Sequence, residues 1–382
     1  MEITGITHTV DSGYARLSAD VVDPSGRKSS VYFETEVGFL PPSDRDATPF
    51  VAGLLMAALR NNEDIQVDGF VSTQLLQGIE SITDILCSWD VGFSKVAVRG
   101  CEARRDLPAK SGTGLFFTGG VDSFYSYLRH RSSATAVSHF ILVHGYDVGL
   151  AQTEHWHRTR STVASIAARE GIELITIKTN LREYTEPHVS WNFAHGGALA
   201  AAALLVRSQF STVYIASSDT GEDPMPYGTH IRLDHHWSTE SLAIVHDGNQ
   251  ARRVEKVKLL AHSDLALSHL RVCWQNLPGQ LNCGRCEKCL RTMIELETAG
   301  ALSRASTFPR TLKPALVRRL RFHLPESQVY PEEDLSALLA SGRNPAVAQA
   351  LSHALSRSRH PTLWARLRRR IRLAVFHGKL KK

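Results

Sequence analysis

Residues 115–123, LFFTGGVDS, combine residue types at a spacing suited to anion binding: an apolar run stops at a threonine, two glycines, an aspartate and a serine. Adjacent glycines permit positive φ and a close backbone approach. A loop between a strand and a helix can also point N–H groups and the helix N-terminus at an anion. An ordinary strand–helix turn is the alternative, and the spacing and lysine of a Walker loop are absent. The residues predicted to form a phosphate-binding loop are Phe117, Thr118, Gly119, Gly120, Val121, Asp122 and Ser123.

A second stretch whose residue types could do chemistry is 273–289, which holds four of the six cysteines of the chain. Two overlapping CxxC steps, with a further cysteine ten residues upstream, offer four soft thiolates suited to tetrahedral zinc. A closed site of four thiolates predicts a structural role. Reduced structural cysteines, a thiol redox pair and an iron–sulfur cluster are the alternatives. The predicted zinc ligands are Cys273, Cys283, Cys286 and Cys289.

Composition is that of a globular protein, with 382 residues, 43% hydrophobic and 21% charged. We find no apolar run of about 18 residues that would predict a membrane span. The first residues, MEITGITHTVDSG, lack the basic and apolar regions of a signal peptide. Clustered cysteines also fit a reducing compartment. We therefore expect a cytoplasmic protein.

The net charge of +6 comes from the C-terminal tail, because residues 356–382 hold seven Arg, three Lys and no acid. Apolar residues between these cations fall near one helical face. Two interpretations stay open: a solvated or docking helix, or a contact with nucleic acid or an anionic membrane surface.

Strand-like and helix-like segments alternate around the glycine loop. We expect strands at 115–117, 139–145, 173–179 and 212–218, with helices at 121–131, 153–170 and 193–209. Such alternation predicts an α/β fold whose parallel sheet is covered by helices on both faces. Ligands bind beyond the carboxyl ends of the strands in such sheets, and the glycine loop lies at such an end.

The flanking regions have a different pattern. Residues 1–108 predict a small N-terminal α+β accessory domain, with strands at 15–22, 29–37 and 93–100 and helices at 49–61 and 72–89. Ser72 is a plausible N-cap of the second helix. We expect a central domain at 109–298 and a helical C-terminal region with the basic tail at 299–382.

Further polar residues are candidates for the same sheet edge. His144 and Asp147 follow the second predicted strand and are suited to contacting ribose, Mg²⁺ or substrate, or are ordinary loop residues. His195 opens the third helix beside two glycines that serve either an anionic group or packing. The polar segment 226–240 is either a substrate lid or a solvated surface. His144 and His195 join the predicted nucleotide site.

TGGVDS resembles the SGGxDS signature of the PP-loop ATP pyrophosphatases, which are similar in fold to the adenine nucleotide α-hydrolases. Those enzymes split ATP into AMP and pyrophosphate. With the distal C…CGxCxxC..R pattern, residues 112–297 resemble the 7-cyano-7-deazaguanine synthase family. That resemblance implies ATP, Mg²⁺ and Zn²⁺ as cofactors. It also implies adenylation of a carboxylate, followed by transfer to an amine or ammonia.

Carried over by position, the resemblance implies that Thr118 to Ser123 bind the ATP phosphates and that the four cysteines hold zinc. Lys256 and Arg291 match a lysine and an arginine of the family, so the implied catalytic residues are Asp122, Ser123, Lys256 and Arg291. The chain departs from the family at 225–230, MPYGTH, and at Trp191-Asn192, where the family has an acid and an arginine. We therefore expect shared ATP chemistry with a different acyl substrate.

Two other functions remain as hypotheses. ATP-dependent thiolation of a nucleobase would need a persulfide-carrying cysteine near the glycine loop, whereas the clustered cysteines are assigned to metal. A non-catalytic nucleotide-binding scaffold would use the N-terminal region and the tail for partners. The sequence does not distinguish a small-molecule, peptide or nucleic-acid substrate.

Overall fold

The structure of the protein is a computed structural model that describes residues 1–40, 44–221, 225–277, 279–322 and 329–359. The chain divides into two compact units, Met1–Arg252 and Arg253–Lys382. The domain boundaries predicted near residues 108 and 298 fall inside these units and stay predictions.

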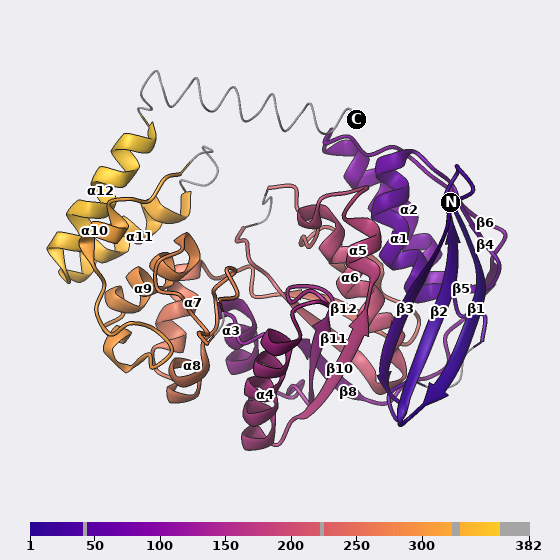
Figure 1. Ribbon diagram of the computed structural model, residues 1–382, viewed down its shortest axis with the longest axis horizontal. Coiled ribbons are helices and arrows are strands. Elements are labelled where there is room, and N and C mark those ends of the chain that lie inside the picture. The colour runs from indigo at the N-terminus through magenta and orange to yellow at the C-terminus, as the bar shows by residue number, and fades with distance from the viewer. Residues whose placement is uncertain (41–43, 222–224, 278, 323–328, 360–382) are drawn as a thin grey trace. The chain divides into compact units, whose positions relative to one another are not determined.

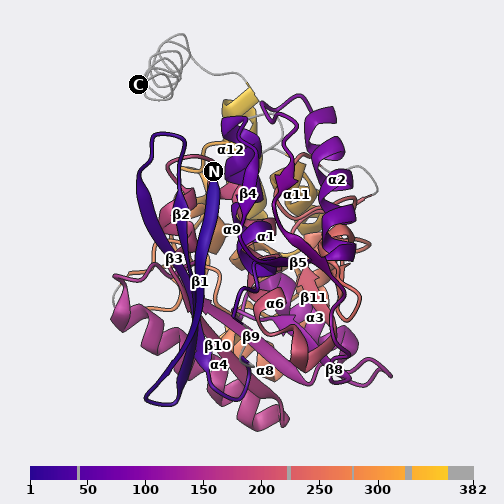
Figure 2. The same ribbon diagram turned by 90° about the vertical axis from the view of Figure 1, so that its right-hand side faces the viewer.

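The first unit is built on a sheet of ten strands (Figures 1 and 2). In spatial order they are β12 (Ala243–Asp247), β11 (Phe210–Ala216), β8 (Gly112–Phe116), β9 (His139–His144), β10 (Glu173–Thr179), β3 (Lys28–Glu36), β2 (Tyr14–Val22), β1 (Glu2–Asp11), β4 (Ile65–Val67) and β6 (Val98–Arg99). A separate parallel pair joins β5 (Phe70–Ser72) to β7 (Glu102–Arg104).

Strands β8 to β12 pair in parallel, and their order along the sheet is β12-β11-β8-β9-β10. The chain thus builds outward from β8 in one direction through β9 and β10. It then returns to the other side of β8 with β11 and β12. At such a reversal the two connections leave toward opposite faces and open a crevice at the carboxyl ends of the strands. That edge, between β8 and β11, is where the topology favours a ligand.

Helices cover both faces of the parallel half of the sheet (Figure 1). On one face α3 (Val121–His130) packs on β8 and β11, and α4 (Thr153–Glu170) packs on β9 and β10. On the other face α1 (Thr48–Asn61) packs against α6 (Trp191–Leu205). Both α1 and α6 are buried almost all round, as expected of Ala- and Leu-rich helices enclosed between layers. The remaining helices of this unit are α2 (Thr73–Ser88), α5 (Leu181–Thr185) and the 3-10 helices η1 (Arg207–Gln209) and η2 (Asp234–Trp237).

The N-terminal strands extend the same sheet. β3 pairs antiparallel with β10, and β1, β2 and β3 form an antiparallel meander. Alternate residues of β2 are buried in the hydrophobic core, and most of those between them are half-exposed. A buried ion cluster also ties the N-terminal region to the end of α6: Arg207 lies 2.8 Å from Asp46 and 2.9 Å from Asp106.

The second unit is helical over its described residues. Its helices are α7 (Arg253–Leu260), α8 (Asp264–His269), α9 (Glu287–Thr298), η3 (Leu302–Arg304), α10 (Pro314–Val317), α11 (Val329–Ser341) and α12 (Pro345–Arg359). The basic segment 360–382, for which two interpretations stood open, lies outside the described residues.

The predicted α/β class is confirmed as a mostly parallel sheet flanked by helices. Ser72 caps α2 as predicted, since its Oγ accepts a hydrogen bond from the Leu75 N–H at 3.1 Å. The sequence did not predict β1, whose buried apolar positions are limited to Ile3 and Ile6. In the part of the chain that the structure describes, no helix is long and apolar enough to cross a membrane.

Candidate functional site

The glycine loop is anchored by an aromatic cluster at the end of β8. The Phe117 ring is fully buried and stacks on Phe140, with 4.1 Å between ring centroids, and its edge contact with Phe124 spans 4.9 Å. The Phe117 N–H donates to the Ile141 carbonyl at 3.0 Å. Because the fold uses both the ring and the N–H, Phe117 fixes the start of the loop. A ligand contact by this residue would have to use its carbonyl.

The backbone of the loop presents hydrogen-bond donors. Gly119 has a φ of +75°, a conformation that L side chains rarely adopt, and Gly120 is the extended N-cap of α3. The Phe124 N–H donates to the Gly120 carbonyl at 3.0 Å and closes the first helical turn. Within the described residues, the N–H groups of Gly119, Gly120 and Val121 make no hydrogen bond. Such donors at a helix N-terminus form a ready site for an anion.

Side chains along the loop alternate in exposure. Thr118 and Asp122 are half-buried, whereas Val121 and Ser123 are buried. The Ser123 hydroxyl donates to the Gly120 carbonyl at 3.2 Å. The Thr118 hydroxyl has no hydrogen-bond partner among the described residues. Thr118 and Asp122 are therefore the loop side chains that a ligand could contact, whereas Ser123 stabilises the loop through its hydrogen bond to Gly120.

The end of β11, the strand next to β8, carries a polar residue that the sequence analysis did not single out. Ser217 directly follows β11 and is fully buried. Its N–H donates to the Asp247 carbonyl at 2.7 Å, and its hydroxyl donates to the Asp219 carbonyl at 2.7 Å. The ends of β11 and β12 are thereby tied together beside the glycine loop. A serine closing an apolar strand next to the expected switch point was the available signal.

His195 is engaged by its own unit rather than exposed to a ligand. Its Nδ1 lies 3.0 Å from the Trp191 carbonyl, so Nδ1 carries the proton and Nε2 accepts from the Thr229 hydroxyl at 3.2 Å. Burial lowers the pKa of this imidazole. A Cβ on the adjacent Gly196 would lie 1.8 Å from the Gly228 carbonyl oxygen. The glycine next to His195 thus serves close packing, and the nucleotide role of His195 stays a prediction.

His144 ends β9, the neighbour of β8, and is 6% exposed. Its ring stacks on Trp156 of α4, with 4.5 Å between centroids and 6° between planes. The buried Nε2 has no hydrogen-bond partner. Burial, reinforced by the charge of Lys178, lowers the pKa of His144. Its contact with a nucleotide stays a prediction.

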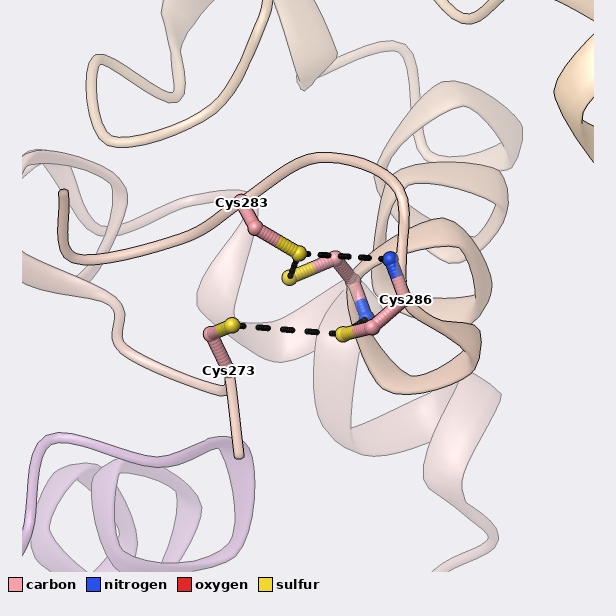
Figure 3. A group of neighbouring side chains, drawn as sticks. Cys273, Cys283 and Cys286 are labelled. Carbon is pink, nitrogen blue, oxygen red and sulfur yellow. Dashed lines mark hydrogen bonds between the residues drawn. The ribbon is translucent and has the colours of Figure 1, made fainter. Parts of the chain in front are cut away.

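In the second unit the four predicted zinc ligands converge (Figure 3). All four Sγ atoms lie within 4.8 Å of one another. The Cys273–Cys286 and Cys283–Cys289 sulfur pairs are 4.0 and 3.9 Å apart, far beyond a disulfide bond. Four sulfurs at about 2.3 Å from a tetrahedral zinc would lie roughly 3.8 Å apart. The cluster therefore fits a metal such as zinc.

The start of α9 shapes this cluster. Cys286 is the N-cap of α9, and its Sγ accepts the Cys289 N–H at 3.4 Å. The Cys283 Sγ accepts the Cys286 N–H at 3.2 Å. Hydrogen bonding from Cys289 lowers the pKa of Cys286 to about 5. N–H donors stabilise thiolates, the form in which cysteine binds metal.

A buried asparagine that sequence reasoning missed holds the two halves of the cluster together. The Asn282 Oδ1 accepts the N–H groups of Val272 and Cys273, at 2.8 and 3.2 Å. Its Nδ2 donates to the carbonyls of Leu270 and Thr307, at 2.8 and 3.3 Å. Asn282 thereby positions Cys273 beside the CxxC segment. An asparagine directly before the first of two overlapping CxxC steps was the only local hint.

Lys256 and Arg291, the two cations implied by family resemblance, belong to the second unit. Lys256 lies in α7 and is 1% exposed. Arg291 lies in α9, with its Nε 3.7 Å from a Glu287 carboxylate oxygen and its guanidinium 5.1 Å from the centre of the Tyr330 ring. The glycine loop belongs to the first unit, so a shared site with these cations stays a prediction.

Comparison with known proteins gives no match: neither a family model, nor a curated protein sequence, nor a solved structure resembles the chain to a significant degree.

Proposed function

We propose that this protein is a cytoplasmic PP-loop enzyme that adenylates a carboxylate with ATP, releases pyrophosphate and passes the acyl group to a nitrogen nucleophile. The observation that carries the proposal is the glycine loop. It offers N–H donors at a helix N-terminus, beside the reversal point of a parallel sheet. The TGGVDS sequence of the loop adds the resemblance to the PP-loop signature.

In this proposal the loop binds the phosphates that leave as pyrophosphate. The N–H groups of Gly119, Gly120 and Val121 donate to phosphate oxygens, and the Thr118 hydroxyl adds a further donor. Fixed donors aimed at developing negative charge lower the barrier without reorganising during the reaction. Mg²⁺, for which Asp122 is the nearest carboxylate in the loop sequence, would supply further charge neutralisation.

The cysteine cluster has a structural part in this proposal. Four thiolates fill a tetrahedral zinc and leave no position for substrate. All four clustered cysteines are then occupied, which disfavours their use as persulfide carriers for thiolation. Lys256 and Arg291 remain the proposed cations for the developing charge.

ATP–pyrophosphate exchange over a panel of carboxylates, deazapurine acids included, tests the proposal. Exchange that depends on one acid, and that falls at least a hundredfold in Asp122→Asn, is the expected result. The matched control is Asp84→Asn, which changes an exposed carboxylate of α2 away from the glycine loop. No exchange with any acid, together with no AMP release on addition of amines, peptides or tRNA, would overturn adenylation. ATP binding without turnover would favour the scaffold.

A further inference from the structure

A cavity of about 200 Å³ lies in the first unit between α4 and the strands β2, β3, β9 and β10. It holds roughly six or seven waters by volume, at about 30 Å³ for each. The buried His144–Trp156 stack lines it, together with His157, Arg160 and Lys178. His157, Arg160 and Lys178 have no part in the proposed binding of ATP at the glycine loop.

One wall of the cavity carries a polar side-chain atom without a hydrogen-bond partner. The His144 Nε2 is buried and has no hydrogen-bond partner. A buried polar atom without a partner is unfavourable, and a hydroxyl can pair with an imidazole nitrogen as donor or as acceptor. A ligand hydroxyl would satisfy it.

The charges around the cavity favour an anion. Arg160 of α4 and Lys178 of β10 both line it, and neither has an acidic partner among the described residues. Glu34, the acid in the lining, is already bound by Arg16, whose Nε lies 2.9 Å from its carboxylate. Arg160 and Lys178 therefore line the cavity without an acidic partner in the described part of the chain, and such a pair of cations is suited to binding a phosphate or a carboxylate.

The cavity is set apart from the glycine loop. The loop opens α3, which packs on β8 and β11, whereas the cavity lies along α4, β10 and the N-terminal strands. β10 and β3 pair through Lys178 and Glu34, so the antiparallel extension of the sheet builds its outer wall.

We propose that this cavity is a second small-molecule site, for a small acid that carries a hydroxyl: a hydroxycarboxylate or the phosphate ester of a polyol. The anionic group lies between Arg160 and Lys178, and the hydroxyl pairs with the His144 Nε2. The site needs none of the glycine-loop residues, and it offers His144 a role other than the predicted nucleotide contact.

Calorimetric titration of the full chain with malate, succinate and glycerol 3-phosphate tests the proposal. Malate and succinate share their carboxylates and differ in one hydroxyl, so malate binds about fivefold tighter if that hydroxyl reaches His144. His144→Phe keeps the ring stack on Trp156 and removes Nε2, and the preference for malate should vanish. Stronger binding of glycerol 3-phosphate than of malate would identify the phosphate ester as the ligand class.

Arg160→Gln and Lys178→Gln should each weaken binding about tenfold, whereas Arg169→Gln, on the same helix but outside the cavity, should not. Gly119→Ala should leave this binding intact even where it abolishes ATP exchange, which separates the two proposals. The second site is refuted if none of the three acids binds at millimolar concentration. Binding unaffected by Arg160→Gln and Lys178→Gln, or lost in Gly119→Ala, refutes it as well.

Discussion

The glycine loop and the cysteine cluster are both short motifs, yet they are built in opposite ways. The loop uses backbone N–H groups from adjacent residues, and its side chains mostly face the core. The cluster uses side-chain sulfurs drawn from two segments, which a buried asparagine clamps together. A site made of backbone depends on conformation, whereas a site made of side chains depends on residue identity and on the clamp.

This difference predicts unlike sensitivities. Away from Thr118 and Asp122, the loop should depend on its backbone conformation, so a Cβ where φ is positive should disrupt it. The cluster should tolerate changes of the surrounding chain but not the loss of one sulfur.

The largest effect is expected at the cysteines. Cys289→Ser should reduce bound zinc from one ion per chain to nearly none. It should also unfold the helices around α9, because structural zinc contributes about 10–16 kcal/mol to the folding of small sites. Metal analysis and limited proteolysis of residues 253–359 measure the outcome. Cys101→Ser, at a half-buried thiol outside the cluster, is the control, and a full zinc complement in Cys289→Ser would contradict a four-cysteine site.

The next effect concerns the loop backbone. Gly119→Ala forces a Cβ into a φ of +75°, at a cost of about 1–2 kcal/mol, and displaces the N–H donors. ATP–pyrophosphate exchange should fall about a hundredfold, as for the loss of one fixed donor. Gly171→Ala imposes the same kind of strain at a φ of +68° with nothing within 4 Å. Equal losses in both variants would mean that the loop acts through stability alone.

The contrast also explains what the sequence could predict. Gly119 and the CxxC steps sit in local patterns, so the glycine loop and the cysteine cluster could both be singled out as candidates without a structure. Helices α3, α4 and α6 likewise fall in segments that the sequence predicts as helical. The pairing of β3 with β10 was not predictable, because residues 34 and 178 meet only through the fold.

The same limit applies to single residues. Asn282 looks like any polar loop residue until its four hydrogen bonds are known. His195 appeared suited to a ligand because it opens a helix, whereas both ring nitrogens face residues of its own unit. His144 gained a second interpretation through β2 and β3, which the sequence assigned to a separate domain.

A smaller effect tests the clamp. Asn282→Ala removes the partner of two N–H groups and of the Thr307 carbonyl, whereas the Leu270 carbonyl keeps the Thr307 hydroxyl; the free energy of unfolding should fall by about 3 kcal/mol. Zinc affinity should fall about tenfold or more, since outer partners orient metal ligands. Gln280→Ala, exposed on the same loop, should change neither. Competition with a zinc chelator measures the affinity, and unchanged affinity would show that Cys273 needs no clamp.

The smallest effect is a pH dependence of the stability of the first unit. The backbone N–H groups of the glycine loop do not titrate and so add nothing to it. Burial lowers the folded-state pKa values of His195 and His144. These histidines therefore bind protons more readily in the unfolded chain than in the folded one. The stability that the two neutral imidazoles contribute is present above the unfolded-state pKa of about 6.5. It is lost as the pH falls through their folded-state pKa values. His195→Gln should reduce the loss of stability between pH 7.5 and 5 by about 1 kcal/mol, in denaturant titrations at the two pH values. Exposed His235→Gln should leave it unchanged. If the two variants behave alike, His195 titrates freely, and its position facing Trp191 and Thr229 would then be available to a ligand after all.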